Sequence, residues 1–311
     1  MALDPKFRAM LSMPGAQFGR PPPEVTPAMM REGARALASP LPPAAVHAVT
    51  TIRVASPAGE IQVRLYYPVS ERPLPLTLYM HGGGWVLCDL ESHDNLCRDL
   101  AIASRSVIAS VDYRLAPETK FPGPLEDCYA ALTHLVAEAA NYGLDAGRIA
   151  VSGDSAGANL AAALALLTRS RGGPAICFQA LLYPALDASC STGSYAEFSA
   201  GYMLSAEAMR WFWECYLSSP ADAKNPLAAP SCATNVSGLP PASISTCEYD
   251  ILRDEGEAYA DALREAGIDV TSRRYLGMIH GFPQFPYVTE VANRAITDLG
   301  GDLAHAFYGS R

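Results

Sequence analysis

Several features that mark other classes of protein are absent from this sequence. No apolar run reaches the roughly 18 residues that a membrane-spanning helix needs, so we expect no membrane span. Basic residues are too few for a nucleic-acid surface, because 23 Lys and Arg stand against 32 Asp and Glu, which gives a net charge of −9. No run of like charges is long enough to act as a tail. The composition is that of a soluble protein, and we expect it to bind no nucleic acid.

The N-terminal residues and the cysteine spacing bear on the cellular compartment. Residues 1–8 lack the apolar core of a signal peptide, which predicts a cytoplasmic location. The 8 cysteines form no C-x-x-C pair and no spacing typical of a metal site, so we expect free thiols and no metal. Half of the 311 residues are hydrophobic, enough for one large domain or a domain with a cap.

The most specific local pattern is Gly153-Asp154-Ser155-Ala156-Gly157. It lies between an apolar, strand-like run at 148–152 and an alanine-rich, helix-like run at 158–169. This is the G-x-S-x-G nucleophile elbow, in which small neighbours allow a tight turn from strand to helix. The turn exposes the serine hydroxyl at a helix N-terminus, where N–H groups and the helix dipole favour negative charge. We therefore predict that Ser155 is a nucleophile.

A second glycine-rich segment follows the buried strand predicted at 74–80. His81-Gly82-Gly83-Gly84-Trp85 exposes backbone N–H groups that no side chain blocks, as an oxyanion hole requires. We interpret His81 as a residue that orients this loop. The triad partners of a G-x-S-x-G serine follow it in the chain, and His81 precedes it.

Two histidines, His280 and His305, follow Ser155. His305 lies in the last amphipathic helix, whereas His280 lies in a loop after the strand predicted at 270–276, so His280 is the predicted general base. The acid must lie between the serine and the histidine, and the candidates are Glu248, Asp250, Asp254, Glu255 and Glu257. We prefer Asp250, which leaves the end of the strand predicted at 242–247. The last three candidates open a helix, where its dipole accounts for acidic residues.

Five segments together resemble the hormone-sensitive-lipase-like carboxylesterases, the bacterial family IV enzymes related to acetyl esterases and arylacetamide deacetylases. The segments are 81–85, 112–118, 153–160, 250–256 and 280–282, in the family's order. The resemblance implies an α/β-hydrolase fold, a triad of Ser155, Asp250 and His280, and no cofactor. It also implies an oxyanion hole made by the N–H groups of Gly83, Gly84 and Ala156. The chain departs from the family at Ile251, where proline is usual, and at Ala158, where glycine is common.

Strand-like and helix-like segments alternate, which predicts a mainly parallel sheet with helices on both faces. We expect about eight strands, the first two forming an antiparallel pair. The predicted strands cover 50–56, 61–68, 74–80, 107–111, 148–153, 176–183, 242–247 and 270–276, and the predicted helices cover 92–104, 122–141, 156–171, 254–266 and 287–306.

Two regions fall outside this alternation, and we predict that both form a cap. Residues 1–47 are proline-rich with a helix-like stretch at 27–38, and residues 186–228 contain an aromatic helix at 209–217. The catalytic core would then comprise residues 48–185 and 229–311. We predict that Trp85, Trp211 and Phe282 line the substrate pocket. Packing of the aromatic helix on the core is an equally good interpretation, since its aromatic residues point to different sides.

The predicted function is hydrolysis of short- to medium-chain carboxylic esters, with a small-molecule ester as substrate and no cofactor or metal. A homodimer through the last strand, at 270–276, is implied by the resemblance alone. Two alternatives stay open. The same triad would cleave amides, because an oxyanion hole serves both reactions. A small-molecule receptor that has lost catalysis is disfavoured, because Ser155, Asp250 and His280 are all retained.

Overall fold

The computed structural model describes residues 2–13, 15–36 and 40–309. Within these residues eight strands form one sheet in the order β1-β2-β4-β3-β5-β6-β7-β8. β2 is antiparallel to β1 and β4, and the remaining pairs are parallel. The strands are β1 (Ala48–Ser56), β2 (Gly59–Tyr67), β3 (Leu74–Met80), β4 (Val107–Asp112), β5 (Leu144–Asp154), β6 (Phe178–Leu182), β7 (Ala242–Tyr249) and β8 (Val270–Ile279). The predicted mainly parallel sheet with a leading antiparallel pair is confirmed.

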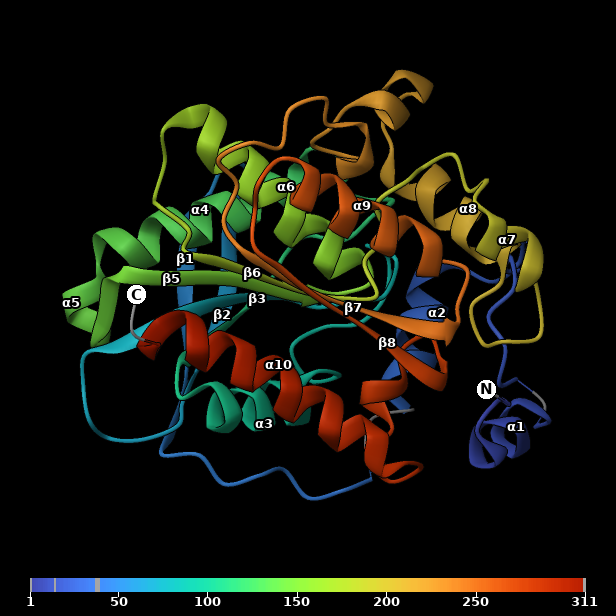
Figure 1. The fold of residues 1–311 in the computed structure, drawn as a ribbon, viewed down its shortest axis with the longest axis horizontal. Helices are drawn as coiled ribbons and strands as arrows, with labels where there is room; N and C mark the ends of the chain where they lie inside the picture. Colours follow the sequence, from blue (N-terminus) through green and yellow to red (C-terminus); the bar gives the residue numbers. More distant parts are fainter. Residues whose placement is uncertain (1, 14, 37–39, 310–311) are drawn as a thin grey trace.

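Helices cover both faces of this sheet. Figure 1 shows α4, α6 and α9 on one face and α3 and α10 on the other. The helices are α1 (Pro5–Leu11), α2 (Pro27–Ala36), α3 (Asp94–Ser104), α4 (Gly123–Ala137), α5 (Ala139–Tyr142), α6 (Ala156–Arg171), α7 (Gly193–Glu197), α8 (Ala206–Tyr216), α9 (Arg253–Glu265) and α10 (Glu290–Tyr308), with short 3₁₀ turns at Pro220–Lys224, Pro230–Cys232 and Phe282–Gln284. None of the helices described is long and apolar enough to cross a membrane.

The core forms because the central elements are apolar on every side. All of β3 is buried, as expected for a strand covered by helices on both faces. Successive side chains of β3 enter opposite layers: Leu78 and Met80 pack with the α4 and α6 side, and Tyr79 packs with the α3 and α10 side. α6 is buried from Ala156 to Thr168, which explains its alanine-rich sequence.

Two predicted helices differ from those observed. The helix predicted at 122–141 is interrupted at Glu138, whose backbone leaves helical geometry (φ −102°, ψ 18°), and α5 then turns the chain toward β5. The helix-like stretch predicted at 27–38 is seen as α2 up to Ala36, and its last two residues lie outside the described part of the chain.

The two segments that the sequence analysis assigns to a cap lie close together. Figure 1 shows α1, α2, α7 and α8 at the end of the sheet where β7 and β8 end. Phe18, between α1 and α2, forms a bridge with the loop before α8: its N–H donates to the Met203 carbonyl (2.6 Å), and its carbonyl accepts from the Ser205 N–H (3.1 Å). Arg20 adds a bidentate ion pair to Glu214 on α8.

Candidate active site

The elbow at Ser155 is a tight turn in which the backbone approaches itself closely, as the glycines of the motif predict. Ser155 lies between the end of β5 and the start of α6, with φ 55° and ψ −118°, a conformation that costs a non-glycine residue about 1–3 kcal/mol. A Cβ at Gly157 would collide with the Met80 carbonyl, and a Cβ at Gly153 would collide with the Gly157 backbone. Both motif glycines are therefore required by close backbone approach.

Strand register brings the elbow and the candidate triad to one edge of the sheet. Gly153 pairs with Met80, so the elbow and the loop that begins at His81 leave the sheet side by side. Tyr249 pairs with Ile279, so the residues that follow them, Asp250 and His280, also leave together.

The three predicted triad residues meet in a continuous hydrogen-bonded chain. His280 Nε2 lies 3.0 Å from Ser155 Oγ, and His280 Nδ1 lies 2.8 Å from Asp250 Oδ2. Asp250 is buried, and its Oδ1 accepts from the Leu252 N–H (3.0 Å). The Tyr183 ring meets the imidazole edge to face, with centroids 4.9 Å apart. This is the nucleophile–base–acid geometry that acyl transfer uses.

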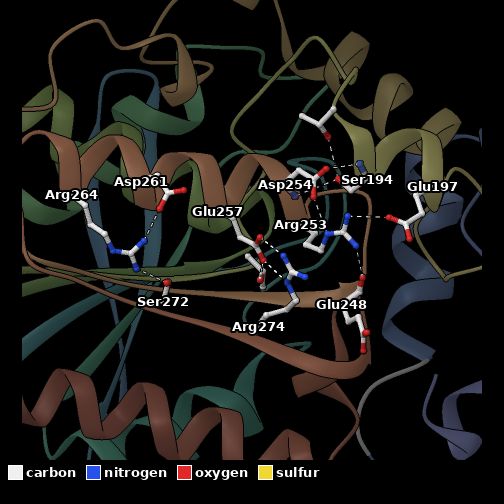
Figure 2. A network of polar contacts seen from close by, with 12 residues as sticks. Ser194, Glu197, Glu248, Arg253, Asp254, Glu257, Asp261, Arg264, Ser272 and Arg274 are labelled. Carbon is white, nitrogen blue, oxygen red and sulfur yellow. Dashed lines mark hydrogen bonds and ion pairs between the residues drawn. The ribbon is translucent and has the colours of Figure 1, made fainter. Parts of the chain in front are cut away.

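The other four acidic candidates are engaged elsewhere, and Figure 2 shows two of them, Asp254 and Glu257, with their partners. Glu248 Oε2 accepts from the Gly277 N–H (2.6 Å), and Glu257 binds Thr246 and Arg274. Asp254 accepts from the Ser194 N–H of α7 (2.7 Å) and from Arg253 (2.8 Å). Glu255 is buried, which raises the pKa of its carboxyl well above the ordinary value, and it accepts from the Leu186 N–H (2.6 Å). The geometry therefore distinguishes Asp250 from its neighbours where spacing alone did not.

The glycine loop after β3 has two peptide units held by specific hydrogen bonds. His81 Nδ1 donates to the Gly82 carbonyl (2.8 Å), so the Gly83 N–H points away from the imidazole. The Gly83 carbonyl accepts from the Val86 and Leu87 N–H groups (3.1 and 2.8 Å), so the Gly84 N–H points away from that turn. Gly83 and Gly84 both have positive φ, 104° and 61°, which glycine adopts at low cost. Ala156, the third predicted donor, opens α6.

Asp154, the variable residue of the elbow, anchors the glycine loop from inside. Its buried Oδ1 accepts from the Gly82 N–H (2.9 Å) and the Tyr79 hydroxyl (2.8 Å), and it lies 3.1 Å from His93 Nε2. Burial opposes ionisation of Asp154, but the charge and hydrogen bond of His93 outweigh it, and the pKa of the carboxyl is lowered. Sequence reasoning missed this role, although an acidic residue next to the nucleophile was a visible signal.

The predicted pocket residues differ in exposure. Trp85 is fully buried and stacks on Tyr216 of α8, with centroids 4.3 Å apart. Phe282 is buried against Tyr275 (5.1 Å). Of the three, Trp211 is the one that is partly exposed. Sequence reasoning did not single out Phe212 for the site, but its ring packs so closely on Gly84 that a Cβ there would collide with it.

Within the described residues, no group of three or more His, Cys, Asp or Glu could hold a metal ion. The arrangement of Ser155, His280 and Asp250 contains a nucleophile, a base and a partner for that base. These are the groups that acyl transfer requires.

Comparison with known proteins identifies the class. The model of a family described as having the alpha/beta hydrolase fold matches residues 77–284. Carboxylic ester hydrolase LipN of Mycobacterium tuberculosis is 43% identical over 256 residues, which are 80% of this chain and 68% of that protein. Ethyl acetate hydrolase of Pseudomonas putida is 38% identical over 240 residues, 76% of each chain. The solved structure of a hyperthermophilic esterase from the archaeon Pyrobaculum calidifontis is 40% identical, has a TM-score of 0.91 and covers 98% of both chains.

The chain thus belongs to the α/β-hydrolase family. Within that family, the predicted membership of the hormone-sensitive-lipase-like carboxylesterases is confirmed.

Proposed function

We propose that this protein is a carboxylesterase in which Ser155 is the nucleophile, His280 the general base and Asp250 its partner. The observation that carries the proposal is the unbroken chain from Ser155 Oγ to His280 Nε2 (3.0 Å) and from His280 Nδ1 to Asp250 Oδ2 (2.8 Å), placed on a nucleophile elbow. The ester hydrolases among the relatives support the same chemistry.

The reaction proceeds through two tetrahedral intermediates. Ser155 Oγ attacks the acyl carbon while His280 Nε2 takes the hydroxyl proton. His280 then donates that proton to the leaving alkoxide, which departs as an alcohol and leaves an acyl-enzyme. His280 then takes a proton from water, which attacks the acyl-enzyme. When the second intermediate collapses, His280 returns the proton to Ser155 Oγ and the carboxylic acid is released. Asp250 holds the Nδ1–H tautomer and stabilises the imidazolium without taking the proton.

The oxyanion of both intermediates is stabilised by backbone donors. We propose the N–H groups of Gly83, Gly84 and Ala156 for this role. The hydrogen bonds to the Gly82 and Gly83 carbonyls support this role, because they fix the directions of the Gly83 and Gly84 N–H groups before the substrate binds. Preorganised donors avoid the cost of reorientation during the reaction, which is why one such donor is worth roughly 10²–10³ in kcat.

The substrate proposal is a small ester with a short to medium acyl chain. Ser155 is only 6% exposed, which suits a small substrate better than a lipid surface. We propose that residues 1–47 and 186–228 form a cap and that Trp211 lines the substrate pocket. We further propose that the protein is cytoplasmic.

We also propose that the protein forms a homodimer through β8, because β8 is an edge strand of the sheet and its Leu276 is half exposed. Conversion of the dimer to monomers by Leu276→Lys, measured by light scattering, would test it.

The function is tested by initial rates on p-nitrophenyl esters from acetate to palmitate. We expect the highest kcat/KM at short or medium chains and no burst or turnover in Ser155→Ala. The matched control is Ser237→Ala, which removes an exposed hydroxyl in the turn before β7 and should keep full activity. A rate that survives in Ser155→Ala would refute the nucleophile. Faster turnover of the matching p-nitroanilides would replace the ester proposal with amide hydrolysis.

A further inference from the structure

Arg31 is a charged side chain of α2 that reaches the loop carrying the glycines. Its Nε donates to the Val86 carbonyl (2.7 Å) and its Nη2 donates to the Ala116 carbonyl (2.9 Å). The guanidinium also forms a bidentate ion pair with Glu118 (2.9 and 2.7 Å). The Arg31 side chain is 21% exposed, whereas that of Glu118 is 60% exposed. The two hydrogen bonds from Arg31 to the carbonyls are therefore better shielded from solvent than its ion pair with Glu118.

The two carbonyls belong to segments that support each other. Val86 and Ala116 are fully buried, so their carbonyl oxygens depend on protein donors. The Ala116 N–H donates to the Trp85 carbonyl (2.8 Å), which joins the segment after β4 to the glycine loop. Arg31 closes this arrangement by bonding one carbonyl from each segment. A planar fork of donors can make both bonds at once, which an ammonium group does less well.

The turn that Arg31 contacts sets the direction of the Gly84 N–H. The Val86 N–H donates to the Gly83 carbonyl (3.1 Å), and the Leu87 N–H donates to the same oxygen (2.8 Å). Because the peptide between Gly83 and Gly84 is planar and trans, fixing that carbonyl fixes the N–H on its opposite side. A shift of the turn at Val86 would therefore rotate the Gly84 N–H.

We propose that Arg31 is a positioning residue for the oxyanion hole, through which helix α2 of the N-terminal segment holds the turn at residues 83–87. This inference rests on the proposed function and deepens it. Arg31 touches neither Ser155 nor His280 in the structure, so it acts through the backbone of the glycine loop. Its loss should reduce stabilisation of the transition state more than binding of the ground state.

Three variants of α2 and its partner separate positioning from docking. Arg31→Gln removes both the charge and the fork. Arg35→Gln is the matched control, because Arg35 lies one turn later on α2 and pairs with the Asp89 side chain (2.6 Å) instead of with loop carbonyls. Glu118→Gln removes the ion pair of Arg31 but leaves its two carbonyl bonds.

The assay measures kcat and KM on p-nitrophenyl butyrate, together with the Ki of an alkyl trifluoromethyl ketone. That inhibitor forms a hemiketal whose oxyanion occupies the hole. We expect Arg31→Gln to lower kcat by roughly ten- to a hundredfold with KM within about twofold, because a small misplacement of a catalytic group costs up to 10²-fold. The Ki should rise by the same factor as kcat falls. Arg35→Gln and Glu118→Gln should stay within about threefold of wild type on both measures.

Arg31→Lys keeps the experiment decisive if Arg31→Gln fails to fold. Lysine retains the charge but not the fork, so we expect an intermediate loss of kcat with a normal melting temperature. An unchanged kcat and Ki in a folded Arg31 variant would overturn the proposal, as would equal losses in Arg31→Gln and Arg35→Gln. If Ser155→Ala remained active, the proposed function itself would fail. If Ser155→Ala were inactive and Arg31→Gln fully active, the positioning role alone would fail.

Discussion

His81 makes the stability of this protein depend on pH in a defined range. The imidazole is completely buried, stacks on Tyr113 (4.4 Å between centroids) and bonds the Gly82 carbonyl. Burial first, and the charge of neighbouring His93 second, lower the pKa of His81 from 6.5 to about 4. The native protein therefore resists protonation at a site that the unfolded chain protonates readily.

The sign and size of the effect follow from these two pKa values. Between pH 6.5 and 4 the unfolded state binds more protons at this site than the native state does. The free energy of unfolding consequently rises with pH across this range and falls on acidification. The full difference is about 3 kcal/mol, since one pKa unit corresponds to about 1.4 kcal/mol, and about 2 kcal/mol of it is lost between pH 7 and pH 5.

Urea unfolding followed by tryptophan fluorescence at pH 7 and pH 5 would measure this contribution. We expect wild type to lose about 2 kcal/mol more stability on acidification than His81→Gln, whose amide can still donate to the Gly82 carbonyl but does not titrate. His305→Gln, at an exposed position of α10, controls for the removal of one histidine. Equal losses in wild type and His81→Gln would refute the reasoning.

Three further substitutions test the elbow, the core and the triad. Gly157→Ala drives a Cβ into the Met80 carbonyl and should cost about 3 kcal/mol in thermal unfolding, whereas Gly301→Ala, on α10 with open space around it, should gain about 0.5–1 kcal/mol. Asn159→Ala removes the buried amide that donates to the carbonyls of Ala185 (2.7 Å) and Ala228 (2.8 Å), and should lower the urea-unfolding free energy by about 3 kcal/mol. Asp250→Asn should lower kcat by about 10⁴-fold with the fold intact by circular dichroism, because the amide favours the wrong His280 tautomer. A smaller loss than tenfold would show that another group orients the imidazole.

Local signals were sufficient to predict most of the secondary structure. The predicted bounds of β3 and α6 agree with those observed. A continuous apolar run is typical of a buried strand, and an alanine-rich run after a nucleophile elbow is typical of a helix. The elbow could also be predicted from its five-residue motif, although the close approach that requires Gly157 is to the Met80 carbonyl, which lies far away in the sequence. Helix ends were less well predicted, as at Glu138, because the direction of the following strand decides where a helix stops.

Part of the candidate site needed the folded chain. Spacing alone left five acids open, and strand register then placed Asp250 beside His280 while its neighbours found other partners. The complete burial of Trp85 could not be predicted, because it depends on α8 lying over the glycine loop.

The sequence by itself determined the fold class, the nucleophile elbow, the glycine loop and the chain order of serine, acid and histidine. The elbow and the glycine loop each lie within five consecutive residues, and the alternation of strands and helices and the order of the triad residues can be followed along the chain without knowing how it folds. Only the tertiary structure decided which distant groups support them. Asp154 meets Gly82 across 72 residues, and Arg31 meets Val86 across 55. Such contacts depend on the order of strands in the sheet and on how α2 lies against the loop. Spacing along the chain does not encode that arrangement, because a hydrogen bond between distant residues forms only after the segments carrying them have been packed together.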